Sequence, residues 1–192
     1  MTVETTSGGE YLEGRILIAM PTMSDPRFKK TIILLCTHNE EGAMGIVLNK
    51  NIEAFTFGSL LEQLEIQHDN SLDKTRVHFG GPVDAERGFI LHSTDTIQEN
   101  STVIGEGIAL TATLDMLERM ATGEGPDSSF IALGYAGWGP GQLEAEIQSN
   151  GWLVVDADPE LVFSEQIGGK WQAAIDKLGF DPGLLSMDAG HA

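Results

Sequence analysis

Short apolar runs, each bounded by polar or glycine-rich residues, recur along the chain. Such runs are typical of buried strands, which are shorter than helices and end at turn residues. The clearest, Thr31–Thr37, is joined by the polar turn Asn39–Gly42 to Met44–Leu48, which predicts a β-hairpin. The predicted strands are Arg15–Met20, Thr31–Thr37, Met44–Leu48, Val77–Phe79, Phe89–His92, one or two within Thr102–Leu110, Phe130–Leu133 and Trp152–Val155. We expect Val77–Phe79 and Phe89–His92 to form a second hairpin with a long loop.

Helices are predicted where apolar residues recur at helical spacing or where capping residues precede them. The predicted helices are Phe57–Leu64, Ala112–Ala121, Pro140–Ser149, Pro159–Phe163 and Lys170–Leu178. Thr56, Thr111 and Asp158 are the expected N-caps, because their side-chain oxygens can accept hydrogen bonds from first-turn N–H groups. Gly123 is the expected end of the second helix. The predicted buried face of that helix consists of Leu110, Leu114, Leu117 and Ala121.

The order of these elements indicates the fold class. Strands dominate the first half and helices the second, with strands interspersed, which favours an α+β fold with a mixed, largely antiparallel sheet flanked by helices. At 192 residues, a single domain over residues 1–192 is expected. The ends, residues 1–10 and 181–192, are polar, acidic or small, and we expect them to be flexible.

The stretch Phe130–Ile147 combines a predicted strand, a glycine-rich turn and a helix start. Gly139 is the predicted N-cap, since proline suits the first helical position that follows it. Gln142 can then reach back to the cap N–H, and Trp138 can pack on Leu143 as a hydrophobic staple. A glycine turn before a helix could also bind an anion. No nucleotide-binding glycine pattern is present, so a structural turn is the favoured interpretation.

Charge narrows the classes of partner. The net charge is -18, from 29 acidic and 11 basic residues. This balance disfavours direct binding to nucleic acid or to anionic membranes, which need a basic surface. It is compatible with a basic partner protein or with solubility alone. The one basic cluster, Arg27 with Lys29 and Lys30, is interpreted as a solvated loop.

Cysteine content and the N-terminal residues indicate the compartment. The single cysteine, Cys36, excludes an internal disulfide and fits a reducing environment. The N-terminus lacks the features of a signal peptide, and no apolar run approaches the ~20 residues of a membrane helix. A cytoplasmic protein is expected.

Cys36 and His38 are the candidate reactive residues. They alternate on a predicted strand, so both side chains should point to one face. They could form a nucleophile pair, or bind zinc together with His78 or His92. The sequence supplies no second paired metal motif, and a lone cysteine is usually a small buried apolar residue. The favoured interpretation is structural, and we predict no metal site and no cofactor.

Two glycine turns suggest a cleft. Glycine turns leave room for a ligand or an extended peptide to approach the backbone. Asn49 could face such a cleft or hold its own turn by side-chain hydrogen bonds. Trp138 could stack on a ligand or serve as the staple. The predicted cleft residues are Asn49, Gly80, Gly81, Pro82, Gly137, Trp138, Gly139 and Gln142.

Seven motifs in order resemble the AlgH/YqgE family of bacterial proteins. They are Gly14–Pro21, Asp25–Phe28, Cys36–His38, Gly42–Asn49, Gly80–Val83, Gly88–His92 and Gly134–Leu143. The resemblance implies an α+β fold whose bent, bifurcated sheet closes into a pseudo-barrel. It implies no established activity, although some members carry the label of transcriptional regulator. The sequence contains no recognisable helix-turn-helix, so any role in transcription is expected to act through a protein partner.

The sequence therefore favours a module that binds a partner protein or a small ligand through the cleft. One alternative is an enzyme of unknown reaction that uses Cys36 and His38. A second alternative, a regulator that binds DNA directly, is disfavoured by the net charge of -18.

Overall fold

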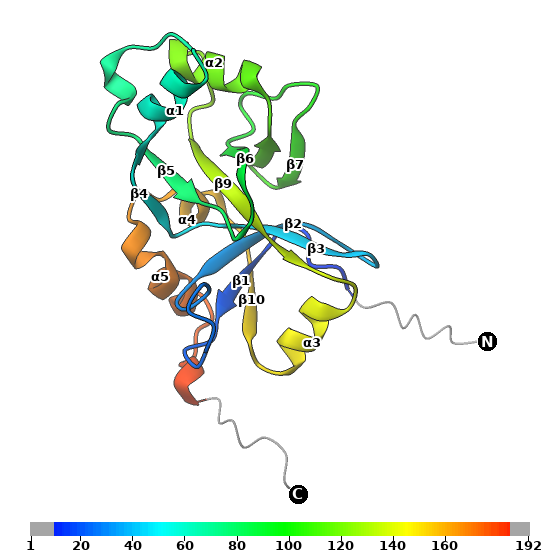
Figure 1. The fold of residues 1–192 in the computed structure, drawn as a ribbon. Helices are drawn as coiled ribbons and strands as arrows, with labels where there is room; N and C mark the ends of the chain where they lie inside the picture. The colour runs from blue at the N-terminus through cyan, green and yellow to red at the C-terminus, as the bar shows by residue number, and fades with distance from the viewer. Residues whose placement is uncertain (1–9, 185–192) are drawn as a thin grey trace, which may run out of the picture.

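The structure is a computed structural model that describes residues 10–184 (Figure 1). The strands are β1 Arg15–Ala19, β2 Ile32–Asn39, β3 Gly42–Val47, β4 Asn51–Thr56, β5 Arg76–Phe79, β6 Val83–His92, β7 Thr102–Gly105, β8 Ile108–Thr111, β9 Ser129–Trp138 and β10 Trp152–Asp156. The α-helices are α1 Phe57–Gln63, α2 Leu114–Thr122, α3 Gln142–Gln148, α4 Pro159–Phe163 and α5 Lys170–Asp176. Short 3₁₀ turns lie at Asn70–Leu72, Ile167–Gly169 and Pro182–Leu184.

The strands form one strongly curled sheet in the order β10-β1-β2-β3-β9-β6-β8-β7, with every neighbouring pair antiparallel. β5 pairs with β4 and lies parallel to β9. The predicted α+β class with a largely antiparallel, bent sheet is confirmed. The sheet curls into a half-barrel. The closure into a pseudo-barrel that the family resemblance implied stays a prediction.

β9 is the centre of the sheet, and it includes residues that were predicted to form a glycine turn. Its first half pairs with β5 and β6, and its second half pairs with β3, as in the match of Gly45 with Ala136. Gly134 lies between the halves with a φ of +75°. Residues 134–138, predicted to form a turn, are therefore strand, because residues 136–138 pair with β3 and Tyr135 pairs with Val83 of β6. The glycines bend the strand instead of ending it.

The two glycine-rich segments meet in space. A Cβ atom on Gly81 would lie 2.0 Å from the carbonyl carbon of Tyr135, and one on Gly80 would lie 2.2 Å from the oxygen of Gly134. The backbone of the β5–β6 connection thus lies against β9 at a distance that only glycine permits. The predicted hairpin between β5 and β6 is wrong, since each of these strands pairs with β9 instead.

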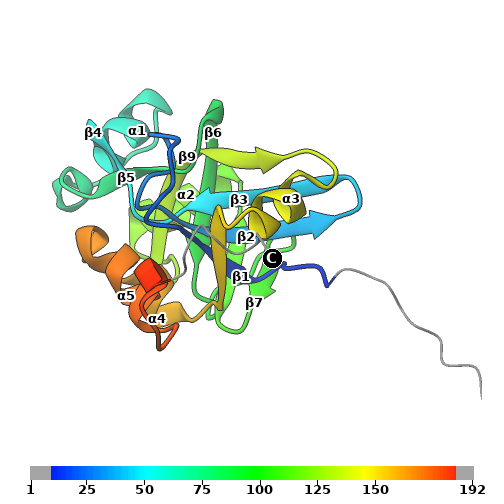
Figure 2. The same ribbon diagram turned by 90° about the horizontal axis from the view of Figure 1, so that it is seen from below.

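The helices lie in three separate places around the sheet (Figures 1 and 2). α1 and α2 lie together at one end and share an apolar cluster that includes Phe57, Leu61 and Met116. α4 and α5 bury Leu161 and Ala174 against the cluster that also contains Cys36. α3 packs alone on the opposite surface of β1–β3. Its buried contact there is made through Leu143, in one cluster with Trp138, as the staple prediction required.

Capping was predicted well for some helices and wrongly for others. Thr56 and Asp158 cap α1 and α4 through their side chains, and Gly123 ends α2 with a φ of +80°. The cap of α2 is Thr113 instead of Thr111, because Thr111 lies in β8. This shift of the helix leaves Leu114 exposed, and Leu110 also belongs to the strand. The buried face of α2 is Met116, Leu117 and Ala121.

The start of α3 also differs from the prediction. Gly141, with a φ of +71°, is the N-cap, so Gly139 and Pro140 precede the helix. The predicted flexible ends largely fall outside the described residues, but Pro182 is buried within a 3₁₀ turn. In the described part of the chain, no helix is both long and apolar enough to cross a membrane.

Candidate functional site

A groove of about 310 Å³ opens between the β1–β2 loop, the start of β6 and helix α3. We call it the tryptophan groove, and its lining consists of Met23, Asp25, Arg27, Phe28, Pro82, Val83, Gly137, Trp138, Gln142, Glu146, Ser149, Gly151 and Trp152. Four of the predicted cleft residues line it, namely Pro82, Gly137, Trp138 and Gln142. The close approach of Gly81 to Tyr135 is what carries Pro82 to the side of β9.

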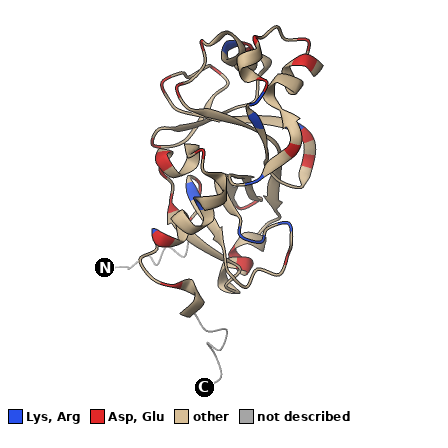
Figure 3. Cartoon of the chain, turned by 90° about the vertical axis from the view of Figure 1, so that its left-hand side faces the viewer, with Lys and Arg blue, Asp and Glu red and all other residues tan. Residues whose placement is uncertain are grey.

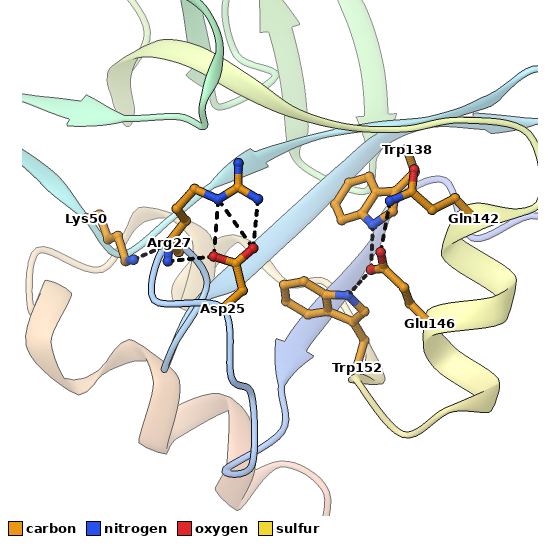
Figure 4. A network of polar contacts seen from close by, with 7 residues as sticks. All are labelled: Asp25, Arg27, Lys50, Trp138, Gln142, Glu146 and Trp152. Carbon is orange, nitrogen blue, oxygen red and sulfur yellow. Dashed lines mark hydrogen bonds and ion pairs between the residues drawn. The ribbon is translucent and has the colours of Figure 1, made fainter.

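One carboxylate organises the wall formed by α3 and the two tryptophans. Glu146 Oε2 accepts hydrogen bonds from Trp138 Nε1 at 2.9 Å and from Trp152 Nε1 at 2.8 Å (Figure 4). The two indole rings meet edge to face, with centroids 6.1 Å apart. Hydrogen bonds to a carboxylate are stronger than those between neutral groups. Glu146 therefore fixes both rings in one arrangement.

Gln142 links this wall to the end of β9. Its Nε2 donates to Glu146 Oε1 at 3.0 Å, and its Oε1 accepts from the backbone N–H of Gly139, also at 3.0 Å. The predicted reach of Gln142 to the Gly139 N–H is therefore present, although Gly139 is not the N-cap. Because both ends of the amide are engaged, Gln142 is a rigid part of the wall.

The β1–β2 loop forms the opposite wall. Arg27 Nη2 donates to Asp25 Oδ2 at 2.8 Å, and Arg27 Nε donates to Asp25 Oδ1 at 3.1 Å (Figure 4). These hydrogen bonds lower the pKa of Asp25 below its usual value. The Arg27 side chain is 61% exposed, so its other N–H groups face solvent. Phe28, which also lines the groove, meets Trp152 edge to face, with ring centroids 5.7 Å apart.

The other predicted cleft residues do not line the groove. Asn49 accepts from the Ile32 N–H at 3.0 Å and donates to the Lys30 oxygen at 2.8 Å, so its side chain holds its own turn. Gly80 and Gly81 are covered by β9, and their role is to permit the close approach described above. Four of the predicted residues thus line one groove, whereas the Asn49 side chain is engaged within its own turn. That the groove binds a ligand stays a prediction.

Cys36 and His38 lie on opposite faces of β2, which corrects the predicted pairing. A β-bulge between Leu35 and Thr37 breaks the alternation of the strand. Cys36 enters the core beneath α5, whereas His38 pairs with Ala43 on the surface that α3 covers. The two side chains therefore cannot act as a nucleophile and its base.

His38 and Cys36 each have a structural environment. His38 Nδ1 accepts from the Leu12 N–H at 2.9 Å, and His38 Nε2 lies 2.8 Å from Glu144 Oε1. The pKa of Glu144 is lowered, first by a hydrogen bond from its own backbone N–H and also by His38. Burial raises the pKa of the Cys36 thiol to about 12, and the charge of Glu13 adds to this. At neutral pH, Cys36 is therefore an unreactive thiol.

The other histidines do not complete a metal site with Cys36. His92 is buried, with Nε2 at 2.7 Å from the Thr111 hydroxyl. His78 stacks on Phe130, with ring centroids 4.3 Å apart. Within residues 10–184, no three His, Cys, Asp or Glu side chains are grouped so as to hold a metal ion.

Sequence reasoning missed Glu146 and assigned Arg27 to a solvated loop. A signal for Glu146 existed, because Gln142 and Glu146 are four residues apart on a predicted helix and can interact. A signal for Arg27 was the Asp25-Pro-Arg27 turn, in which an aspartate can bond a residue two positions later. The lining contains no His, Cys or Lys. The amide and indole groups of the Trp138 wall are already hydrogen-bonded.

A curled half-barrel sheet with a groove between α3 and the β1–β2 loop defines an α+β protein with a candidate binding site. The sequence profile of the AlgH-like family matches residues 16–183, and the chain belongs to this family. A UPF0301 protein from Methylocella silvestris is 50% identical, over 96% of this chain and 93% of the relative. One from Jannaschia sp. is 54% identical, over 94% of this chain and 95% of the relative.

Two solved structures share the fold. The solution structure of the AlgH protein from Pseudomonas aeruginosa has a TM-score of 0.78 and 40% sequence identity, and the match covers 97% of this chain and 98% of that one. A crystal structure of a Corynebacterium diphtheriae protein has a TM-score of 0.72 and 21% identity, over 88% of each chain. The relatives' names describe a family of uncharacterised function, so function has to be argued from the site.

Proposed function

We propose that the protein is a binding module and that the tryptophan groove receives a segment of a partner protein. The observation that carries this proposal is the shared carboxylate of Glu146. Its Oε2 accepts hydrogen bonds from Trp138 Nε1 at 2.9 Å and from Trp152 Nε1 at 2.8 Å, and so holds both rings in fixed positions. A wall that is already ordered loses little conformational entropy on binding, so more of the contact energy becomes affinity. Large aromatic side chains of this kind are enriched in interface hot spots.

The chemistry of the groove favours an apolar side chain flanked by polar groups. Phe28 and the Val83 side chain, which is 39% exposed, offer apolar surface beside the tryptophans. Asp25 and Arg27 at the rim offer one charge of each sign. The volume of about 310 Å³ fits one or two side chains of a peptide better than a whole domain.

The charge of the molecule favours a basic partner. With a net charge of -18, the protein attracts cationic surfaces and repels nucleic acid. Figure 3 shows Asp and Glu positions spread over helices and strands alike. Any role in transcription is therefore proposed to be indirect, through a protein that itself contacts DNA or polymerase. The enzyme alternative receives no support, because Cys36 and His38 lie on opposite faces of β2.

The test is a pull-down that compares two matched substitutions. Val83 and Val103 are both exposed valines in strands, at 39% and 56%, but only Val83 lines the groove. Val83→Asp should remove specifically bound proteins from the wild-type eluate, and Val103→Asp should retain them. Circular dichroism of both variants controls for folding. Equal retention by the two variants would count against the groove as the binding surface.

A further inference from the structure

A second cavity, of about 510 Å³, shares no lining residue with the tryptophan groove. We call it the lysine pocket. It opens between β5, the start of β9 and the segment that joins α4 to α5. Its volume lies within the range of about 300–1,000 Å³ that is usual for small-molecule sites. Figure 3 views the molecule from the side where β4 and α5 lie.

Lys170 is the most unusual residue of this cavity. It is only 1% exposed, yet among residues 10–184 its ammonium group has no carboxylate partner. Its Nζ donates to the backbone oxygens of Val162 at 2.7 Å and of Leu48 at 3.2 Å, which leaves a third N–H. A buried cation without an anion is costly to a protein. Burial lowers the pKa of Lys170 to about 8.

His78 adds an unsatisfied polar atom. The residue is 7% exposed and lines the lysine pocket, and its Nδ1 has no hydrogen-bond partner in the described part of the chain. The His78 ring stacks on the Phe130 ring at a centroid distance of 4.3 Å. Lys170 Nζ lies 5.4 Å from the centroid of the Phe130 ring. Buried polar atoms without partners are rare in proteins and mark places where a ligand or water completes the bonding.

The mouth of the cavity is also basic. Lys74 and Arg76 line it, and Glu165 is the single acidic residue in its lining. With Lys170, the lining has three cationic side chains and one carboxylate. The whole chain has the opposite balance, with 29 acidic and 11 basic residues. The rest of the lining combines apolar side chains, among them Phe57, Met120 and Ile131, with glycines and with the hydroxyl residues Thr75, Ser129 and Ser164.

We propose that the lysine pocket binds a small organic anion, with a carboxylate or phosphate group against Lys170 and Arg76 and an apolar body against Phe130. The anion supplies the negative charge that Lys170 lacks, and it accepts a hydrogen bond from His78 Nδ1, which carries the proton in one tautomer of the neutral imidazole. A charged group of this kind pairs strongly with Arg and Lys in a partly desolvated site. The proposal concerns a site separate from the tryptophan groove and does not depend on the function proposed there.

The experiment follows the imidazole signals of His78 by NMR during titration with four probes. The probes are phenyl phosphate, benzoate, inorganic phosphate and the neutral benzyl alcohol. We expect phenyl phosphate or benzoate to produce saturable shifts at His78 and to raise its pKa, because a bound anion favours the imidazolium. Inorganic phosphate should bind more weakly, since it lacks the apolar body, and benzyl alcohol should not saturate.

Variants test the assignment of the cavity. Arg76→Gln should weaken binding of the tighter anion by about tenfold, equivalent to ~1.4 kcal/mol, whereas Arg87→Gln should leave it unchanged. Both arginines are exposed on strands, but only Arg76 lines the pocket. Lys170→Met should abolish binding, but it also removes two hydrogen bonds, so Arg76→Gln is the decisive variant. Three results would overturn the proposal: no saturable shift with either organic anion, equal binding of benzyl alcohol, or equal effects of Arg76→Gln and Arg87→Gln.

Discussion

Trp138 and Trp152 are joined through a single atom, because both indole N–H groups donate to Glu146 Oε2, at 2.9 and 2.8 Å (Figure 4). Trp138 ends β9 and Trp152 begins β10, two strands that are not neighbours in the sheet. Glu146 lies on α3 between them in sequence. The carboxylate therefore connects the central strand, the helix and an edge strand, and it sets the shape of the tryptophan groove.

Removing this carboxylate should destabilise the protein. Glu146→Ala leaves two partly buried indole N–H groups without an acceptor, so we expect a loss of about 2–3 kcal/mol of unfolding free energy. Glu146→Gln keeps one oxygen acceptor and should cost about half as much. Urea unfolding followed by tryptophan fluorescence measures both losses.

The matched control is Glu118→Ala on α2, where the side chain is exposed. Its effect should stay within about 0.5 kcal/mol, as for most surface substitutions. A Glu146→Ala protein as stable as Glu118→Ala would show that the carboxylate does not organise the wall.

The approach of the β5–β6 connection to β9 gives a second prediction. In Gly81→Ala, the new Cβ atom would meet the Tyr135 carbonyl carbon at 2.0 Å, from a backbone with a φ of +153°. We expect a loss of at least ~2 kcal/mol, because the backbone itself has to move. Gly105→Ala is the control, since no atom lies within 4 Å of its added Cβ. Similar thermal midpoints for the two variants would contradict the close approach.

The sequence predicted the elements whose burial is visible in local pattern. β2 was found because its side chains from Ile32 to Cys36 are fully buried. β4 was missed, since none of the residues Asn51–Thr56 is buried and no apolar pattern marks it. The second half of β9 was mistaken for a turn, because glycine density is ambiguous between a turn and a bent strand.

The candidate site was predictable only in part, because some of its residues are brought together only by the tertiary fold. Trp138, Gln142 and Pro82 stood out as chemically unusual residues in glycine turns. Glu146 did not, because its function depends on two tryptophans that only the tertiary fold brings together. The face of His38 was likewise set by a bulge that alternation along the strand does not reveal.

Cys36 provides a third prediction, on reactivity. Its pKa of about 12 lies about three units above that of an ordinary thiol, which lowers the thiolate fraction at neutral pH about a thousandfold. Alkylation by iodoacetamide at pH 7.5 should therefore be at least ~100-fold slower in the native protein than in urea. Rapid native labelling, located at Cys36 by mass spectrometry, would restore the enzyme hypothesis.

The environment of His78 gives a fourth prediction, on acid stability. Burial, and next the charge of Lys170, lower the pKa of His78 from 6.5 to about 4. Between these values the unfolded chain binds more protons than the folded one, so stability falls as the pH drops from 6.5 towards 4. The loss attributable to His78 should reach a few kcal/mol, at about 1.4 kcal/mol per pKa unit.

His78→Gln isolates this contribution from the carboxylates that titrate in the same range. As the pH is lowered from 7 to 4, the wild type should lose more unfolding free energy than His78→Gln does. Urea unfolding at a series of pH values measures it. Parallel curves for the two proteins would mean that His78 is not buried as a neutral imidazole.

The binding function is tested most directly by photo-crosslinking at positions 83 and 103. A photoreactive phenylalanine analogue replaces Val83 in one protein and Val103 in another, and both are irradiated inside the cell. Since both valines are exposed but only Val83 lines the tryptophan groove, we predict discrete covalent adducts with a partner protein from position 83 and not from position 103. Equal adducts from both positions, or adducts from position 103 alone, would contradict the assignment of the groove as the binding surface.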